Sequence, residues 1–466
     1  MGTKRIQYKE ILEPKLDCTN EPVLLSDKTM EERYRKVISR MQEESLDTLI
    51  IYADVEHGSN FEYLTGFIPR FEEALLVVHV DGRNYMLMGN ENLNKVEKSR
   101  LKSTAIHVPY FSLPNQPMIK TKSLKSLLLK AEIEKQKKIG IVGWKNFTNT
   151  FEDNSKLFDV PGYILDEVRG LVENEELLIN ATYVFIGEKG VRCRNNVNEI
   201  EHYEFGASLA SDCMLKAMNK IAVGISEMEL GNELNAYGQY NSVVTIAAAG
   251  KRFEKANIYP TNKQVKEGDA ISLTVGYKGG LSSRAGYAYK QEKDLPTEIK
   301  DYIEVVVKPY FNTIVSWLEN VHCGMKGKEI YSLVDVVLPK ETYNWTLCPG
   351  HLTADEEWMS SPIYEGSEEI LESGMLFQTD IIPSVQGYSG TSAESTILLA
   401  DNKLQKKIAN EAPQLWKRIM KRKEYIRNEL GIDLNADILP MCSSVAYLRP
   451  LLLSKNTAMC VKKNID

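Results

Sequence analysis

Residues 267–280, EGDAISLTVGYKGG, predict a β-strand that ends in a glycine turn, and the same pattern occurs once more in the chain. Residues 373–387, SGMLFQTDIIPSVQG, match it when Gly268 is aligned with Gly374, which places Thr274 opposite Asp380. A long helical pattern and then a shorter one precede each stretch; they occupy 198–221 with 223–234, and 297–320 with 322–334. An internal duplication of a helix–helix–sheet unit is the simplest explanation. Two such units would close their strands around one central pocket.

The residues before this repeat have the pattern of a separate α/β domain. A helix is predicted at 29–44, with Thr29 able to cap its first turn, and a Lys-rich amphipathic helix at 121–135. The predicted strands are 47–53, 73–80, 83–89 and 137–144, and Asp81-Gly82 joins two of them as a hairpin. We therefore predict an N-terminal extension at 1–28, an α/β domain at 29–178, a second domain at 179–402 and a C-terminal extension at 403–466. The last extension is expected to cover a sheet edge or the mouth of the pocket.

Composition and charge exclude several classes of protein. The 466 residues carry 57 Lys and Arg against 64 Asp and Glu, and this modest net charge of -7 lacks the concentrated basic face that nucleic-acid binding needs. The densest basic run, 417–423, is interpreted as a solvated helix face. No apolar stretch reaches membrane-spanning length, the first residues lack the apolar core of a secretory signal, and the seven cysteines are scattered. These features predict a reduced, cytoplasmic protein that binds neither nucleic acid nor membrane.

Three titratable residues of the second half are candidates for chemistry in the predicted pocket. His351 follows Cys348-Pro349-Gly350, Asp380 ends LFQTD, and Glu394 lies in GTSAESTILLAD. One imidazole and two carboxylates suit either a single divalent ion or an acid–base set. The alternative is structural: His351 as a hydrogen-bonded core or turn histidine, and the two acids in ordinary salt bridges.

Several motifs together resemble the creatinase, prolidase and aminopeptidase P family. In chain order they are SNFEYLTGF (59–67), EIEHYEFGASLA (199–210), NIYPTNKQVKEGD (257–269), PGHL (349–352), SGMLFQTD (373–380) and SAESTILLAD (392–401). The resemblance covers roughly residues 30–400. It implies a creatinase-like N-terminal α/β domain followed by a C-terminal domain of the pseudo-twofold pita-bread fold. It also implies a homodimer, and an N-terminal domain that helps to close the active site.

The resemblance also shows where the site departs from the family. Family peptidases hold two metal ions with Asp, Asp, His, Glu and Glu. By the resemblance, the last three fall on His351, Asp380 and Glu394, whereas the first Asp falls on Thr274 and the second falls among residues 283–285. Between Asp269 and Glu292 the chain has no acid at all. Two family histidines are replaced as well, one by Asn257 and the other by Trp358 or Met359. We therefore expect no dinuclear centre, and either no metal or one divalent ion (Mn, Zn or Fe) held by the three retained residues.

The substitutions suggest how the pocket is remodelled. Arg284 either pairs with Asp380 or Glu394 in place of the metal or, with Arg70, holds a substrate carboxylate in bidentate fashion. The other candidate substrate-binding residues are Asn257, Thr274 and Tyr277, although Tyr277 is equally explained by sheet packing.

Three functions remain open from the sequence. The first is a hydrolase or lyase that acts on a small amide, amidino or carboxylate-bearing compound, with His351 as the acid–base group oriented by Asp380 or Glu394. The second is a catalytically inactive homologue that binds a small-molecule ligand or serves assembly. The third is a mononuclear Xaa-Pro peptidase.

Overall fold

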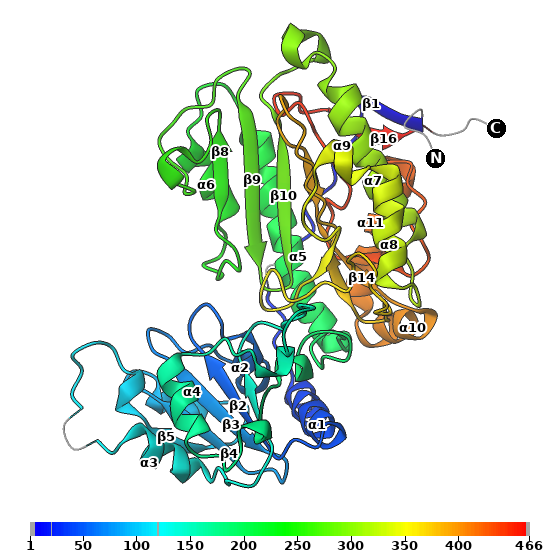
Figure 1. The fold of residues 1–466 in the computed structure, drawn as a ribbon. Coiled ribbons are helices and arrows are strands. Elements are labelled where there is room, and N and C mark those ends of the chain that lie inside the picture. Colours follow the sequence, from blue (N-terminus) through cyan, green and yellow to red (C-terminus); the bar gives the residue numbers. More distant parts are fainter. Residues whose placement is uncertain (1–4, 20, 119–120, 463–466) are drawn as a thin grey trace. The chain divides into compact units, whose positions relative to one another are not determined.

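The computed structural model describes residues 5–19, 21–118 and 121–462, which form two compact units (Figure 1). Unit 2 is Leu25–Cys193, and unit 1 joins Met1–Leu24 to Arg194–Asp466. The predicted boundary at 178/179 is therefore earlier than the observed one. Residues 1–24 of the predicted extension at 1–28 belong to unit 1. None of the described helices is both long and apolar enough to cross a membrane.

Unit 2 is a mixed six-stranded sheet with helices, as expected for an α/β domain. The strand order is β5-β4-β3-β2-β6-β7. In chain order the elements are α1 (Asp27–Glu43), β2 (Thr48–Ala53), α2 (Ser59–Thr65), β3 (Ala74–His79), β4 (Asn84–Met88), β5 (Thr104–His107), α3 (Leu124–Leu128), β6 (Ile139–Val142), α4 (Gly162–Arg169) and β7 (Leu178–Asn180). The Asp81-Gly82 hairpin is confirmed, since β3 and β4 pair antiparallel around it. Ser26, not Thr29, caps α1: its side chain accepts from the Thr29 amide.

Unit 1 contains the predicted duplication. The first half is α5 (Val197–Lys220), α6 (Glu227–Leu234), β8 (Ile246–Ala249), β9 (Ala270–Tyr277) and β10 (Gly280–Tyr287). The second half is α7 (Lys308–Asn320), α8 (Gly327–Val337), α9 (Lys340–Tyr343), β11 (His351–Leu352), β12 (Leu376–Gln378), β13 (Ser392–Glu394) and β14 (Thr396–Leu399). The same main-chain bond occurs in both halves: the Gly224 amide donates to Val265 O and the Gly324 amide to Leu371 O, each at 2.8 Å. The repeated glycines therefore hold equivalent turns, both at positive φ.

Two four-stranded sheets carry these halves, in the orders β13-β10-β9-β8 and β11-β12-β14-β15. The remaining elements are β1 (Ile6–Glu10), α10 (Asn402–Glu411), α11 (Pro413–Asn428), β15 (Ile438–Pro440) and β16 (Thr457–Val461). β15 pairs with β14, so the C-terminal extension covers a sheet edge, one of its two predicted roles. β1 pairs antiparallel with β16 (Figure 1).

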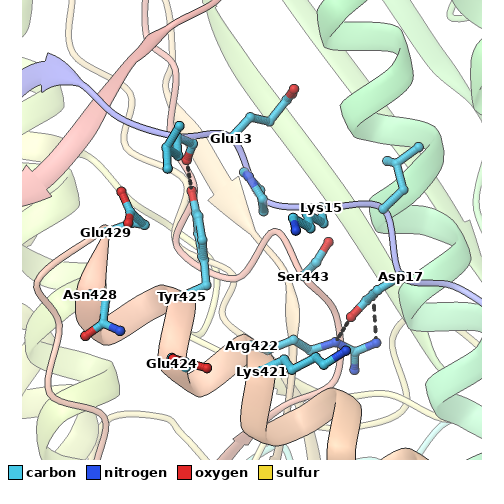
Figure 2. Close-up of a pocket in the computed structure, with 13 residues that line it drawn as sticks. Glu13, Lys15, Asp17, Lys421, Arg422, Glu424, Tyr425, Asn428, Glu429 and Ser443 are labelled. Atoms are coloured by element: carbon cyan, nitrogen blue, oxygen red, sulfur yellow. Dashed lines mark hydrogen bonds and ion pairs between the residues drawn. The ribbon is translucent and has the colours of Figure 1, made fainter.

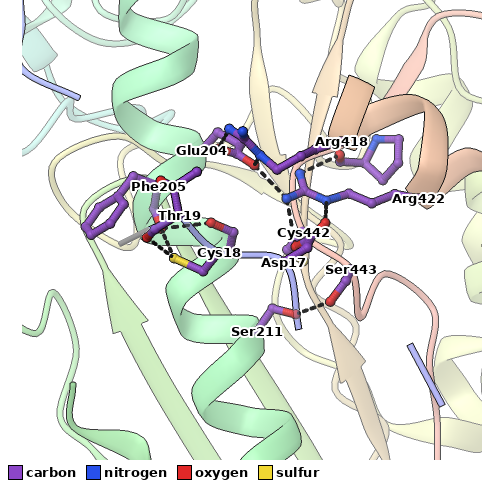
Figure 3. A network of polar contacts seen from close by, with 12 residues as sticks. Asp17, Cys18, Thr19, Glu204, Phe205, Ser211, Arg418, Arg422, Cys442 and Ser443 are labelled. Carbon is purple, nitrogen blue, oxygen red and sulfur yellow. Dashed lines mark hydrogen bonds and ion pairs between the residues drawn. The ribbon is translucent and has the colours of Figure 1, made fainter. Parts of the chain in front are cut away.

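The N-terminal residues 6–18, here called the strap, are held to unit 1 by a buried ionic network. Arg422 of α11 donates to both carboxylate oxygens of Asp17, at 2.6 and 2.9 Å, and to Glu204 of α5 at 2.6 Å (Figure 3). Arg418 binds the same Glu204 in bidentate fashion. The Asp212 carboxylate accepts from the main-chain amides of Asp17 and Cys18. The basic run 417–423 is thus only partly a solvated face, because Arg422 is buried.

A pocket of about 520 Å³ lies between the strap and α11 (Figure 2). Its buried cation, Arg422, is already paired with Asp17, and Tyr425 donates to Leu12 O at 2.7 Å across the pocket. These contacts hold the strap in place.

Replacing Asp17 by Asn is expected to lower the free energy of unfolding of unit 1 by about 2 kcal/mol. The substitution leaves Arg422 buried with only one of its two carboxylate partners. The urea midpoint followed by tryptophan fluorescence measures the change. Asp433→Asn is the matched control, since Asp433 pairs with Arg427 of the same helix but both side chains are exposed, and such pairs contribute at most about 1 kcal/mol. Equal shifts in the two variants would contradict this account of the strap.

Candidate functional site

The three predicted residues His351, Asp380 and Glu394 converge in unit 1. His351 opens β11, after Gly350 has turned the chain at a φ of 123°. Asp380 follows β12 and Glu394 ends β13, so two sheets contribute to one point. The imidazole Nε2 lies 3.9 Å from Asp380 Oδ2 and 3.9 Å from Glu394 Oε1. Within the described chain this is the one group of three His, Cys, Asp or Glu side chains whose ligand atoms could share an ion; these atoms all lie within 4.8 Å of one another.

The site is almost closed to solvent. His351, Asp380 and Glu394 are 0%, 5% and 6% exposed. The imidazole stacks on Trp358, with ring centroids 4.1 Å apart, and its Nδ1 lies 3.2 Å from Leu352 O. Because a carbonyl only accepts, Nδ1 carries the proton and the lone pair of Nε2 faces the two carboxylates.

Two buried atoms at this point have no hydrogen-bond partner among the described residues. They are His351 Nε2 and Glu394 Oε1, both electron-pair donors. Buried polar atoms normally have hydrogen-bond partners, so two buried acceptors without one, aimed at the same point, are suited to bind a cation. The residues therefore fit one divalent cation, with one nitrogen and two carboxylates as ligands.

Burial also shifts the ionisation of the three groups. It lowers the pKa of His351 to about 4, so the imidazole is neutral at physiological pH. It raises the pKa of Asp380 to about 7, with the negative charge of Glu357 adding to the effect. The pKa of Glu394 is raised well above its usual range by burial and by the neighbouring Asp380 and Glu357. A cation would reverse these two carboxylate shifts.

Glu357 is a fourth titratable group that the sequence reasoning missed. Its Oε1 lies 3.7 Å from His351 Nε2, and burial raises its pKa. Its side chain is 26% exposed, more than the other three, so it is the group that reaches toward solvent. The available signal was the run DEEW at 355–358, which places acids a few residues after PGHL.

Thr274 and Ser283 lie on the same sheet face as Glu394. Ser283 is the cross-strand partner of both Thr274 and Glu394, and paired residues project to one side of a sheet. Thr274 Oγ1 and Ser283 Oγ lie 3.0 Å apart and share a hydrogen bond. Hydroxyls therefore stand at two neighbouring positions of this face.

Contrary to the expectation from the sequence, the side chain of Arg284 does not point into the site. It pairs with Leu273 and Ala393, so it projects to the opposite face from the Glu394 carboxylate. All five of its donors are used: they go to the carbonyls of Ser283, Glu394, Ser444 and Tyr447 and to Ser395 Oγ. The expected ion pair with Asp380 or Glu394 is wrong, and no donor remains to hold a substrate carboxylate.

The other predicted substrate-binding residues lie elsewhere. Tyr277 is buried, and its hydroxyl donates to Leu234 O at 2.8 Å and accepts from the Ala236 amide at 3.0 Å, which favours the packing alternative. Asn257 is exposed in a turn, where its side chain accepts from the Tyr259 amide. Arg70 is exposed in unit 2, and its contact with a substrate stays a prediction.

Peptidases are among the known proteins to which this chain is similar. The chain is similar to "Uncharacterized peptidase YqhT" of Bacillus subtilis (strain 168), with 26% identity over 222 residues, which are 46% of this chain and 61% of that protein. Among solved structures, an Xaa-Pro dipeptidase from Bacillus anthracis has a TM-score of 0.58 at 17% identity, covering 80% of this chain and 96% of that one. Dipeptidase PepE from Mycobacterium ulcerans has a TM-score of 0.60 at 12% identity, covering 81% and 95%. The structural likenesses establish the fold.

Two family models match in the order of the two predicted domains. The Creatinase/Prolidase N-terminal domain matches residues 33–170, and Metallopeptidase family M24 matches residues 201–401. The second match contains His351, Asp380 and Glu394. With the α/β domain, the duplicated pita-bread domain and the converging triad all in place, the chain belongs to the creatinase, prolidase and aminopeptidase P family.

Proposed function

We propose that this protein is a hydrolase of small peptide-like amides whose site holds one divalent cation between His351, Asp380 and Glu394. The observation that carries the proposal is the pair of buried, unsatisfied acceptors, His351 Nε2 and Glu394 Oε1, beside the Asp380 carboxylate. A second ion is not part of the proposal, because hydroxyls rather than carboxylates stand at Thr274 and Ser283.

The protein's own groups have distinct tasks in this proposal. A cation bound at the three residues would supply Lewis-acid polarisation of a carbonyl and a lower pKa for water. His351 is held as a neutral ligand by its Nδ1 contact with Leu352 O and by stacking on Trp358. Glu357 moves protons between the site and solvent, because it combines a raised pKa with partial exposure. Thr274 and Ser283 share one hydrogen bond, which leaves one hydroxyl proton to orient a substrate.

Elemental analysis tests the proposal. After mild dialysis and reloading with Mn²⁺ or Zn²⁺, we expect about one ion per chain in the wild type and a large loss in Glu394→Gln. Glu365→Gln is the control, since Glu365 is exposed in the same half of unit 1 and makes no contact with the triad. Hydrolysis of a panel of Xaa-Pro and other dipeptides is then measured with the loaded protein. If the wild type holds no metal after loading with Mn²⁺ and none after loading with Zn²⁺, the proposal is overturned.

The affinity for Mn²⁺ is expected to rise with pH. A ligand carboxyl must lose its proton before it binds, and the pKa of Asp380 is raised to about 7 by burial, while His351 is already neutral above about pH 4. Titration calorimetry between pH 5 and 7 should show a Kd that falls at least about tenfold per pH unit. Asp380→Asn should reduce that slope. A Kd independent of pH would contradict the assignment of Asp380 as a ligand.

A binding protein without catalysis is the second candidate. It is favoured by the loss of acids from β9 and β10, where the resemblance to family peptidases expects two metal-binding aspartates. The two candidates separate on turnover: a protein that binds one ion and a dipeptide but hydrolyses none of the panel supports the second. We further propose a homodimer and a cytoplasmic location, as the family resemblance and the composition suggest. Light scattering of the purified protein tests the dimer.

A further inference from the structure

The sheet face that carries Glu394 forms a floor of small side chains. Along β9, β10 and β13 several residues of this face are partly exposed, although Glu394 itself is buried, and every residue of the opposite face is buried. The partly exposed set is Ala270, Ser272, Thr274, Ser283, Ala285 and Ser392. Ser272 pairs with Ala285, which pairs with Ser392, so these residues form a second row beside Thr274, Ser283 and Glu394. The floor is rich in hydroxyl groups, and its second row contains no carboxylate.

One cation lies over that floor. Arg252, three residues after β8, donates from its guanidinium to Ser272 Oγ. The side chain is half-buried, and burial lowers its pKa. Within the described chain no carboxylate lies within ion-pair distance of it, whereas Arg422 has two carboxylate partners.

A partly desolvated guanidinium without a carboxylate partner favours a bound anion. Burying a cation without a partner costs free energy, and an Arg fork matches a carboxylate in bidentate fashion. Ser272 lies two residues along β9 and two strands across from Glu394, which corresponds to about 12 Å between their main-chain positions. An extended dipeptide of about 7 Å, together with the side chains at its two ends, covers a span of that order.

We propose that Arg252, fixed by Ser272, binds the free carboxylate of a dipeptide-sized substrate whose amide bond lies at His351 and Glu394. This inference rests on the proposed function and adds a specificity-determining residue to it. It reassigns to Arg252 the carboxylate recognition that the sequence analysis gave to Arg284.

A matched pair of probes tests the role of Arg252. Alanyl-proline carries the free carboxylate, and alanyl-prolinamide replaces it by a neutral amide. Arg252→Gln should raise KM and the calorimetric Kd for alanyl-proline by about 10- to 100-fold and leave both nearly unchanged for alanyl-prolinamide. Lys251→Gln removes the same charge from the preceding residue, which is exposed, and should leave the KM and Kd of both probes unchanged. Arg252→Lys should recover part of the affinity if a fixed cation is what matters.

Hydrolysis and calorimetric binding of the two probes separate this inference from the proposed function. If the wild type hydrolyses alanyl-proline but Arg252→Gln weakens both probes equally, the inference is wrong and the hydrolase proposal stands. If nothing is hydrolysed but calorimetry shows preference for the carboxylate that Arg252→Gln removes, the inference stands and the hydrolase proposal fails. Failure of the wild type to bind either probe would overturn the inference. Circular dichroism of each variant confirms that the comparison is between folded proteins.

Discussion

Replacing His351 by Ala is expected to lower kcat/KM for a hydrolysed dipeptide by about 1000-fold or more, and to remove the bound ion. The reason is that Nε2 is the single nitrogen among the ligand atoms of a site closed to solvent. Activity on the best dipeptide of the panel and metal content after dialysis are measured together. His322→Ala is the matched control, because His322 belongs to the same unit but is exposed.

The two readouts distinguish a ligand from a positioned acid–base group. If His351 acts only in proton transfer, His351→Ala should lose activity but keep its ion, and the pH profile of the wild type should report an imidazole. The pKa of His351, lowered to about 4 by burial, argues against that role at neutral pH. A variant that keeps both the ion and its activity would remove His351 from the site altogether.

Replacing Arg284 by Met is expected to lower the free energy of unfolding of unit 1 by about 4 kcal/mol. The methionine fills most of the space but leaves four main-chain carbonyls without the donors they have now. Two of these carbonyls, of Ser444 and Tyr447, belong to the C-terminal extension, so the contact between β10 and that extension should loosen first. Urea unfolding gives the midpoint and slope, and Arg427→Met, in which an exposed side chain is lost, is the control.

Arg284→Lys separates this structural role from substrate binding. Lysine keeps the charge but has three donors in place of five, so about half of the destabilisation should remain. Its KM for alanyl-proline should equal that of the wild type. A raised KM with unchanged stability would instead restore Arg284 as a substrate-binding residue.

The fold could be predicted because its signals are local and repeated. The Asp81-Gly82 hairpin and the two helix–helix–sheet patterns appear as short or repeated stretches, and each forms as expected. The Lys-rich stretch at 121–135 is different: its α-helical part is only α3, Leu124–Leu128. Its apolar spacing is helical, but after Leu128 the chain continues as a 3-10 helix over Leu129–Ala131, which Glu132 ends in a left-handed conformation.

The sequence predicted that His351, Asp380 and Glu394 come together, but not the positions of residues whose side chains depend on strand register. His351, Asp380 and Glu394 lie at strand ends whose order the sequence shows. Arg284 and Ser283 are adjacent, however, and a shift of one residue moves a side chain to the other face of the sheet. Arg252 and Glu357 lie in irregular segments, so no periodic sequence pattern predicts the direction of their side chains.

Because β1 pairs with β16, unit 1 cannot complete its fold until the end of the chain has been synthesised. Ile6 pairs with Val461, so the first strand leaves the ribosome long before its partner exists. Unit 2, whose residues 25–193 are contiguous, can finish folding while unit 1 still lacks most of its chain. Until residue 422 has been made, the strap has neither Arg422 nor β16 to hold it. A nascent chain stalled before residue 413 should therefore have a protease-resistant unit 2 and a strap that is cleaved readily.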